Sequence, residues 1–363
     1  MSKKLQTLNR RKIMNKKLKY IIYLFSAFLI FLVCYAINYV LRVNNQAEVN
    51  NIIGNREFFY TYDKPISNKA RYGQIKMRLT DRNLVNFALK NQIFEANAEP
   101  IPEEVENTIN ITKKQIEGRD LYFLTSKDNP NPSKYIFFIH GGGYVFNIME
   151  SHWNLIRNIM SQANVGAIVP DYALAPDNKA KNSIPTLIKM YKEALNYVDG
   201  KEIFVIGDSA GGGLSLILGQ QCEKYALNTP SQLILLSPFV DISLENPEAK
   251  IMDKRSAYLP LEGSLKLQDY WCGDLDNKNP LVSPLYGDMK LLPPVSIFIG
   301  GLEIFLPDGL KLADKLKENN KPYRVYYYPM MWHAWQGGYP NMPEDKDAVE
   351  QIANLINIGF ENK

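Results

Sequence analysis

The chain has 363 residues, of which 46% are hydrophobic and 22% are charged. These proportions are typical of globular proteins and exclude a disordered or fibrous chain. The length fits one large domain with additional segments. Three cysteines and three histidines are too few for a disulfide scaffold and leave little for a metal site, so we expect no metal and no other cofactor.

The net charge of +4 arises at one end of the chain. Residues 1–19 contain eight Lys and Arg side chains and no Asp or Glu. The other 34 of the 42 basic side chains are outnumbered by the 38 acidic ones, so the rest of the chain has a net charge of −4. We therefore expect no nucleic-acid binding, because that function usually requires a basic surface.

An uncharged apolar run follows the basic tail. Residues 20–41 contain only Ser26 and Asn38 as strongly polar side chains, and as a helix this run is about 33 Å long, enough to cross a bilayer. The apolar core of a secretory signal is shorter, about 7–15 residues, and ends in a small-residue cleavage site. No such site follows here, so we predict an uncleaved transmembrane signal-anchor, with a cleaved signal as the alternative.

The charges flanking this run predict its orientation. Eight cations precede it, whereas Arg42 is the nearest cation after it. Because positive flanks stay in the cytoplasm, residues 1–19 form a cytoplasmic tail and the chain after about residue 42 lies outside. The prediction is therefore a single-pass protein of the cell membrane with its main domain on the extracytoplasmic side.

The next two segments differ in character. Residues 42–75 are polar and interrupted by Gly54, Pro65 and Gly73, which predicts a linker with some structure near residues 58–60. Residues 76–100 include a helical pattern with these apolar side chains at spacings of three and four: Leu84, Val85, Ala88, Leu89 and Ile93.

From about residue 105, strands alternate with helices. The predicted strands are 107–116, 121–125, 135–139, 165–169, 203–206, 233–236, 295–299 and 324–328. The predicted helices are 152–162, 184–198, one from about 210, 307–319 and 345–360. The first two strands form a hairpin, and strands separated by helices predict an α/β fold, with a mostly parallel central sheet and helices on both faces.

The first chemical motif follows the strand at 203–206. The sequence there is Gly207-Asp208-Ser209-Ala210-Gly211, which opens a helix. This is the G-x-S-x-G pattern, in which small residues allow a tight strand-to-helix turn that exposes the serine hydroxyl. Ser209 is therefore the candidate nucleophile, with Asp208 as a supporting residue of the motif.

The second motif follows the strand at 135–139 and reads His140-Gly141-Gly142-Gly143. Consecutive glycines bring backbone N–H groups close to a ligand, because no Cβ atom intervenes. We predict that the N–H groups of Gly142, Gly143 and Ala210 form an oxyanion hole. His140 and Gly141 support this loop.

The candidate base follows from chain order. In hydrolases with this strand and helix pattern, the triad residues occur along the chain in the order serine, acid, histidine. His333 is the only histidine after Ser209. His140 belongs to the glycine loop, and His152 lies upstream in a predicted helix, where we interpret it as structural.

The candidate acid lies in the loop after the strand at 295–299. Glu303 lies at the end of this strand, 30 residues before His333, whereas Asp308 follows a proline and fits the first turn of the next helix. We favour Glu303 and keep Asp308 as the alternative, because either carboxylate can orient the imidazole if the loop allows.

Together these motifs resemble the hormone-sensitive-lipase-like branch of the α/β-hydrolase superfamily, the carboxylesterases with an HGGG loop. Two further segments share the resemblance: Asp171-Tyr172-Ala173-Leu174-Ala175-Pro176 and Ser283-Pro284-Leu285. The resemblance covers about residues 105–363. It implies an α/β-hydrolase domain over residues 76–363, in which residues 76–104 supply a small N-terminal cap over the site.

The sequence departs from this family at two positions. Glu303 stands where the family usually has aspartate, and Ala173 stands where its D-Y-R-L-A-P motif has arginine, so a supporting ion pair is expected to be absent there. Glutamate is an accepted triad acid in this superfamily.

The expected function is hydrolysis of carboxylic esters with short or medium acyl groups, through an acyl-enzyme. The ester is a small molecule, a lipid or a glycan, and an aromatic, apolar site is expected near Tyr144, Phe146, Trp332 and Trp335. An alternative function is that of an amidase or an acyltransferase, which would use the same triad. An alternative of another class is a catalytically inactive, membrane-tethered scaffold on a hydrolase fold.

Overall fold

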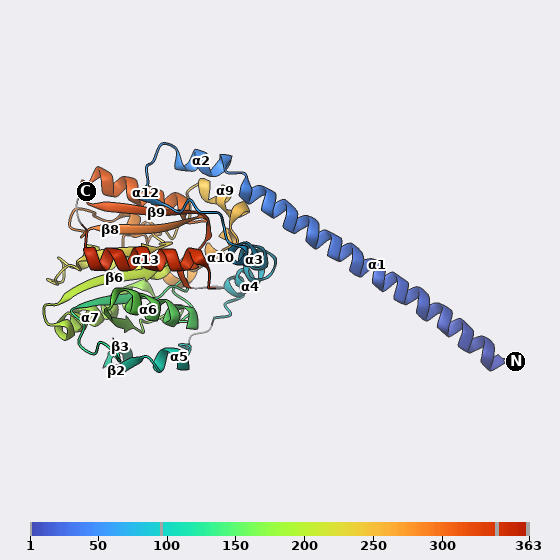
Figure 1. The fold of residues 1–363 in the computed structure, drawn as a ribbon, viewed down its shortest axis with the longest axis horizontal. Helices are drawn as coiled ribbons and strands as arrows, with labels where there is room; N and C mark the ends of the chain where they lie inside the picture. Colours follow the sequence, from blue (N-terminus) through green and yellow to red (C-terminus); the bar gives the residue numbers. More distant parts are fainter. Residues whose placement is uncertain (1, 95–96, 338–340, 361–363) are drawn as a thin grey trace. The chain divides into compact units, whose positions relative to one another are not determined.

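A computed structural model describes residues 2–94, 97–337 and 341–360, and divides the chain into two compact units, Met1–Gln46 and Ala47–Lys363. The first unit is one long helix, α1 (Ser2–Asn44) (Figure 1). Among the described residues, only the stretch Lys16–Ile53 contains a helix long and apolar enough to cross a membrane. A signal sequence near the N-terminus can meet the same criterion of length and hydropathy.

The second unit is built on one sheet to which nine strands of the described chain contribute, in the order β1-β9-β8-β7-β6-β4-β5-β3-β2. The strands are β1 (Tyr60–Thr61), β2 (Ile109–Ile116), β3 (Arg119–Ser126), β4 (Lys134–Ile139), β5 (Gly166–Pro170), β6 (Glu202–Asp208), β7 (Gln232–Leu236), β8 (Val295–Leu302) and β9 (Tyr323–Trp332). The β2–β3 and β3–β5 pairs are antiparallel, and all other pairs are parallel. The predicted α/β fold with a mostly parallel sheet is confirmed.

Every predicted strand is present, and most of them were short apolar runs. All residues of β5, β7 and β8 are buried, as expected for parallel strands covered on both faces. The structure extends the last two predicted strands: β8 continues to Leu302 and β9 to Trp332. These extensions carry the chain directly to the residues predicted to be functional.

Helices lie between the strands. They are α2 (Ala47–Ile53), α3 (Asn68–Lys76), α4 (Arg82–Asn91), α5 (Glu103–Glu106), α6 (Glu150–Ala163), α7 (Ala180–Val198), α8 (Ala210–Gln221), α9 (Glu248–Arg255), α10 (Leu261–Ser264), α11 (Leu267–Trp271), α12 (Leu306–Glu318) and α13 (Pro343–Ile358). A π-helical turn, η1 (Met77–Asp81), joins α3 to α4, and 3₁₀ turns occur at η2 (Pro284–Tyr286) and η3 (Trp335–Gly337). Helices α6 and α13 lie side by side and contact one another (Figure 1).

The segment predicted to be a linker contains ordered elements from residue 47 onward. β1 pairs in parallel with the edge strand β9, and Phe58 packs against Tyr327 with ring centroids 4.7 Å apart. At the start of α3, Ser67 donates to the buried carboxylate of Glu344 through its N–H and its hydroxyl. These contacts join residues far apart in the sequence, so they produce no periodic pattern within the segment itself. The prediction of a linker therefore rested on polar composition alone. We call residues 47–76 the N-terminal strap.

Candidate active site

The predicted functional side chains follow four parallel strands at their carboxyl ends. His140 follows β4, Ser209 follows β6, Glu303 follows β8 and His333 follows β9. Because these strands are parallel and belong to one sheet, their carboxyl ends share one edge, the usual location of sites in open α/β sheets.

Ser209 occupies a strained turn between β6 and α8. Its backbone has φ 54° and ψ −120°, a conformation that non-glycine residues rarely adopt. Hydrogen bonds fix this turn, since the Ser209 N–H donates to the Leu236 carbonyl at 2.8 Å and the Ser209 carbonyl accepts from the Phe239 N–H at 2.9 Å. A Cβ atom at Gly211 would lie 1.9 Å from the Ile139 carbonyl oxygen, which explains the small residue two positions after the serine.

The glycine loop turns tightly beside this serine. Gly142 has a φ of +103°, and its carbonyl accepts hydrogen bonds from the N–H groups of Val145 and Phe146. A Cβ atom on Gly142 would lie 2.4 Å from the Phe146 carbonyl oxygen, so no larger residue fits this turn. Gly142 and Gly143 both line the cavity that Ser209 lines.

His333 and Glu303 form a direct hydrogen bond. The Nδ1 atom of His333 lies 2.9 Å from Oε2 of Glu303, and both side chains are buried. The other carboxylate oxygen, Oε1, accepts from the Ser237 hydroxyl at 2.9 Å and from the Gly300 N–H at 2.6 Å. Glu303 is thus held from three sides, and it leaves Nε2 of His333 as the ring nitrogen not engaged with the acid.

Ser237 is a residue that the sequence analysis missed. Its hydroxyl donates to Glu303 and accepts the N–H of Ala334, at 3.0 Å. It therefore connects the acid to the loop that carries His333. No motif marks this serine, although its position directly after the buried strand β7 places it at the same edge as the other side chains.

Asp308, the alternative acid, lies elsewhere in the hydrogen-bond network. It falls in the first turn of α12, and its Oδ1 accepts from the Asn246 side chain at 2.9 Å. Its Oδ2 has no hydrogen-bond partner among the described residues. Burial raises the pKa of Asp308 to about 6, opposed by the Asn246 hydrogen bond. Of the two candidate carboxylates, Glu303 is the one bonded to His333.

Behind the serine, Asp208 connects the two glycine-containing motifs. Its carboxylate accepts the N–H of Gly141 at 2.9 Å and lies 3.4 Å from Nε2 of His152. Burial acts to raise the pKa of Asp208, but its interactions with His152, His140 and the Gly141 N–H outweigh burial and lower it. His152 thereby has the structural role expected of it, within the support of the glycine loop.

His140 is enclosed completely. Its Nδ1 lies 2.7 Å from the Gly141 carbonyl oxygen, and its ring stacks on Tyr172 with centroids 4.5 Å apart. Burial is the main cause that lowers the pKa of His140 to about 3, so this imidazole is neutral at physiological pH. It supports the glycine loop without carrying charge.

The segment that resembles the D-Y-R-L-A-P motif contains an ion pair with another strand. Ala173 cannot form an ion pair, but the neighbouring Asp171 carboxylate lies 3.5 Å from the guanidinium of Arg119 on β3 and accepts from the Asn147 amide. Asp171 thus has a cation partner from β3, next to position 173, where the arginine of the family motif is absent.

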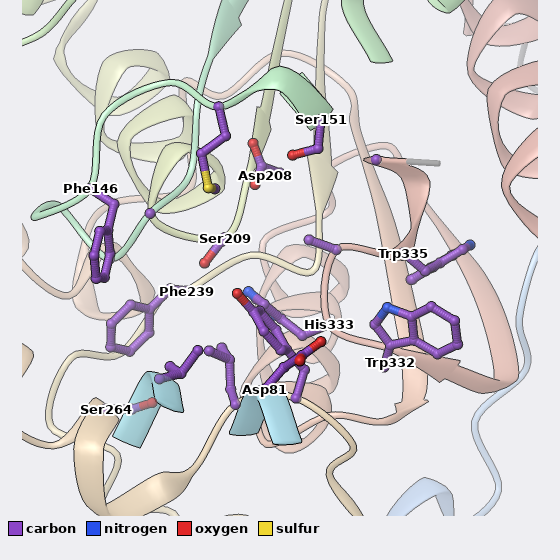
Figure 2. Close-up of a pocket in the computed structure, with 18 of the residues that line it drawn as sticks. Asp81, Phe146, Ser151, Asp208, Ser209, Phe239, Ser264, Trp332, His333 and Trp335 are labelled. Atoms are coloured by element: carbon purple, nitrogen blue, oxygen red, sulfur yellow. The ribbon is translucent and has the colours of Figure 1, made fainter. Parts of the chain in front are cut away.

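Ser209, His333 and the glycine loop open onto one cavity of about 520 Å³. Figure 2 shows the Ser209 hydroxyl turned into this cavity, with His333 on the facing side. The apolar side chains that line it are Met77, Leu84, Val85, Ala88, Leu89, Phe146, Met149, Leu155, Phe239, Leu259, Leu267, Phe305, Trp332, Ala334 and Trp335. The cavity is thus suited to an apolar ligand with one reacting polar group.

The expected aromatic lining is present in part. Phe146, Trp332 and Trp335 line the cavity, whereas Tyr144 is fully buried and stacks on Trp271, with ring centroids 4.4 Å apart. Tyr144 therefore packs in the core and is not part of the cavity lining.

Two separate parts of the chain cover the cavity. Residues of η1 and α4 line it, which are within the predicted cap segment 76–104, and so do Tyr258, Leu259, Ser264 and Leu267 from the region of α10 and α11. The second part was not predicted, because its helices are only four and five residues long and carry no readable periodicity.

Comparisons with known proteins agree with this fold. A family profile described as alpha/beta hydrolase fold matches residues 136–337. A curated esterase from Acinetobacter venetianus is 30% identical over 231 residues, which cover 63% of this chain and 76% of that protein. An acetyl-hydrolase from Streptomyces hygroscopicus is 24% identical over 216 residues, 59% of this chain and 72% of its own length.

A solved structure shares the fold over most of its length. The crystal structure of an esterase from the bacterial hormone-sensitive lipase family superposes with a TM-score of 0.70 at 22% identity. The superposition covers 82% of this chain and all of that one.

Proposed function

The chain belongs to the α/β-hydrolase fold family, in its hormone-sensitive-lipase-like esterase branch, and from this premise we propose that it hydrolyses carboxylic esters with Ser209, His333 and Glu303 as a triad. The observation that carries the proposal is the 2.9 Å hydrogen bond between His333 and Glu303 at a cavity that Ser209 also lines. The names of the relatives, esterase and acetyl-hydrolase, support an ester as the substrate.

In the proposed first step, Ser209 attacks the ester carbonyl. Nε2 of His333 accepts the serine proton while Nδ1–H donates to Glu303, whose charge stabilises the imidazolium that forms. The negative charge on the carbonyl oxygen is stabilised by the N–H groups of Gly142, Gly143 and Ala210. His333 then protonates the departing alcohol, which leaves an acyl group on the serine oxygen.

The second half repeats this chemistry with water. His333 takes a proton from a water molecule as it attacks the acyl carbon, and the same N–H groups stabilise the second oxyanion. The serine oxygen recovers the proton from His333, and the carboxylic acid is released. The hydrogen bonds from Ser237 and Gly300 to Glu303 keep the carboxylate in place through both steps.

The cavity supports an ester with a short or medium acyl group. Its volume is about 520 Å³ and most of its lining side chains are apolar. Such a lining favours a hydrocarbon chain, since each buried CH₂ contributes about 0.8 kcal/mol.

We also propose that α1 anchors the chain in the cell membrane as a single-pass helix. The support is the uncharged run within α1 and the basic tail that precedes it. The positive tail favours a cytoplasmic N-terminus, which places the hydrolase domain on the extracytoplasmic side.

A fluorophosphonate probe and an ester panel test the triad. The full chain in detergent is expected to be labelled covalently and to hydrolyse p-nitrophenyl esters, whereas Ser209→Ala is expected to lose labelling and at least about 10³-fold in rate. Ser264→Ala is the matched control, because it removes another serine hydroxyl from the same cavity, and it should still be labelled.

A folded wild-type chain that resists the probe would favour the inactive scaffold and overturn the proposal. Matched p-nitroanilides and acceptor alcohols in the same panel distinguish ester hydrolysis from amide hydrolysis and acyl transfer. A preference for anilides would mean that the triad hydrolyses amides, and a preference for transfer over hydrolysis would mean that it transfers acyl groups.

A further inference from the structure

The segment that covers the cavity is basic in a domain that is otherwise acidic. Residues 68–91, which form α3, η1 and α4, contain six Lys and Arg side chains and one Asp. This segment therefore has a net charge of +5, whereas residues 20–363 as a whole have a net charge of −4. We call residues 68–91 the cap helices.

Neighbouring carboxylates neutralise part of this charge. Asp81 pairs with Lys76 within the cap helices, Asp253 of α9 pairs with Arg82, and Glu262 of α10 pairs with Lys90. When Asp253 and Glu262 are counted together with the segment, its cations still outnumber the carboxylates by three. The segment thus carries more positive charge than these carboxylates balance.

The outer side of α4 is also apolar. Leu84 is 67% exposed and Phe87 is 60% exposed. Because they are three residues apart in a helix, they share one face. Leu89 is buried on the other side. A helix that is basic and has an exposed apolar stripe is typical of segments that lie at a lipid surface.

The exposed stripe borders the cavity. Leu84 is exposed to solvent and also lines the cavity. Ala88, one turn further along α4, lines the cavity as well. The outer side of α4 therefore continues into the apolar lining that leads to Ser209. An apolar ligand resting against α4 would find the cavity next to it.

We propose that the exposed face of α4, centred on Leu84 and Phe87, docks on an anionic lipid surface, and that the ester substrate enters the cavity from this lipid layer. The inference rests on the esterase proposal for the same cavity. Anionic lipids complement the positive charge of the cap helices, and the apolar side chains insert at the boundary of headgroups and acyl chains. The predicted span ends at Leu41 and the hydrolase unit begins at Ala47, so only a short connection separates the span from the domain.

The substrate class follows from this arrangement. An amphiphilic ester, with a hydrocarbon tail and its carbonyl near the headgroups, passes from lipid to cavity without exposing its tail to water. Direct transfer favours such esters over water-soluble ones, because exposure of each CH₂ group to water is unfavourable.

Fluorescence quenching tests the docking in the full chain. A Cys34→Ala background removes the exposed thiol and leaves the buried Cys222 and Cys272. Asn91→Cys, one turn beyond Phe87, carries an NBD fluorophore, and the chain is reconstituted in phosphatidylcholine vesicles with or without 30% phosphatidylglycerol. We expect headgroup-proximal spin-labelled lipids to quench this fluorophore at least twofold more in the anionic vesicles.

A label at Asp128→Cys is the matched control. Asp128 is exposed and follows β3, which runs antiparallel to β5, so it lies at the sheet edge opposite the site. Quenching at position 91 no greater than at 128 would overturn the proposal. So would a fluorescence shift at 91 that depends on protein density and not on lipid charge, since that result indicates a second copy of the chain on α4.

A kinetic comparison separates docking from catalysis. Phe87 does not line the cavity, so Phe87→Ser is expected to leave hydrolysis of p-nitrophenyl acetate in water unchanged. It is expected to slow hydrolysis of 4-methylumbelliferyl decanoate, a medium-chain ester held in anionic vesicles, at least threefold, whereas Tyr225→Ser, an exposed aromatic outside the cap helices, has no effect. Equal effects of Phe87→Ser on both substrates, or none, would overturn the docking.

The two proposals fail separately in these experiments. A chain that hydrolyses neither ester contradicts the esterase proposal, and with it the delivery of an ester. A chain that hydrolyses p-nitrophenyl acetate but shows no lipid-dependent quenching contradicts the docking alone.

Discussion

At the residue scale, the site depends on which carboxylate orients His333. Glu303 and Asp308 lie five residues apart, and from the sequence alone each was a chemically reasonable candidate. The hydrogen bonds distinguish them, because Glu303 is bonded to His333 whereas Asp308 is bonded to Asn246. Ser237 and Gly300 complete the surroundings of Glu303, and neither was identifiable from the sequence, since a lone serine after a strand has many structural uses.

Replacing the proposed acid gives the first prediction. Glu303→Gln keeps the side-chain shape but removes the charge and disfavours the tautomer of His333 that accepts the serine proton. We expect kcat for p-nitrophenyl acetate to fall by about 10³–10⁴, with a smaller change in KM. Steady-state kinetics measures this loss, and Asp308→Asn is the matched control that should keep most of the activity. A larger loss in Asp308→Asn than in Glu303→Gln would reverse the assignment.

The raised pKa of Asp308 gives a prediction about stability. Burial is the main cause that raises its pKa to about 6; Asp241 and Glu248 act in the same direction, and Asn246 and Lys311 oppose them. An unfolded aspartate titrates near about 3.9. Between these values the folded chain binds a proton that the unfolded chain does not. The free energy of unfolding therefore falls as the pH rises through this window, by up to about 3 kcal/mol.

Asp308→Asn removes this titration. The variant should gain stability relative to wild type as the pH rises from about 4 to 7, because asparagine stays neutral throughout. Urea unfolding of both chains at several pH values measures the difference, and all other groups contribute equally to the two curves. Curves that stay parallel over this range would show that Asp308 titrates normally.

At the scale of elements, the N-terminal strap is bound to the strand that leads to His333. The buried side chain of Gln74 donates from Nε2 to the Met330 carbonyl on β9 at 2.6 Å. A Cβ atom on the neighbouring Gly73 would lie 3.0 Å from the ring of Trp332. Helix α3 therefore packs directly on the end of β9, one residue before His333.

Weakening this contact gives the next prediction. Gln74→Leu removes the hydrogen bond to Met330, and we expect a loss of about 1–3 kcal/mol in the free energy of unfolding together with a lower kcat, because His333 follows the affected strand end. Thermal unfolding and p-nitrophenyl acetate kinetics measure both. Gln115→Leu, on the exposed strand β2, is the matched control. Unchanged kinetics in a destabilised Gln74→Leu would restrict α3 to a structural role.

The elements show why some of the fold was predictable and some was not. Strands such as β4 and β7 are short apolar runs, and a run of that length in an α/β pattern has few other interpretations. The strap is held by particular pairs, such as Ser67 with Glu344, that join positions 277 residues apart. Pairs of this kind leave no local pattern, so the segment was predicted only as a linker. The short helices α10 and α11 were missed for the same reason.

At the scale of the whole molecule, the chain consists of a helical unit and a hydrolase unit. The hydrolase unit, Ala47–Lys363, contains the strap, the complete sheet and every residue that lines the cavity. Its candidate functional side chains were predictable because the topology of the sheet determines their order along the chain and their positions after strands. The lining of the cavity by the cap helices was predictable only in outline.

Two truncations test how far this division holds. A chain that begins at Ala47 lacks α1 but keeps the strap, so we expect it to be soluble and to hydrolyse p-nitrophenyl acetate at the rate of the full chain in detergent. A chain that begins at Met77 also loses β1 and α3, which uncovers the aromatic edge of β9 and removes the hydrogen bonds to Glu344 and Met330. We expect it to aggregate or to lose activity, as measured by size-exclusion chromatography and ester hydrolysis.

Aggregation of the chain beginning at Ala47, with an active full chain in detergent, would mean that α1 stabilises the hydrolase unit as well as tethering it. Full activity of the chain beginning at Met77 would mean that the sheet positions His333 without the strap.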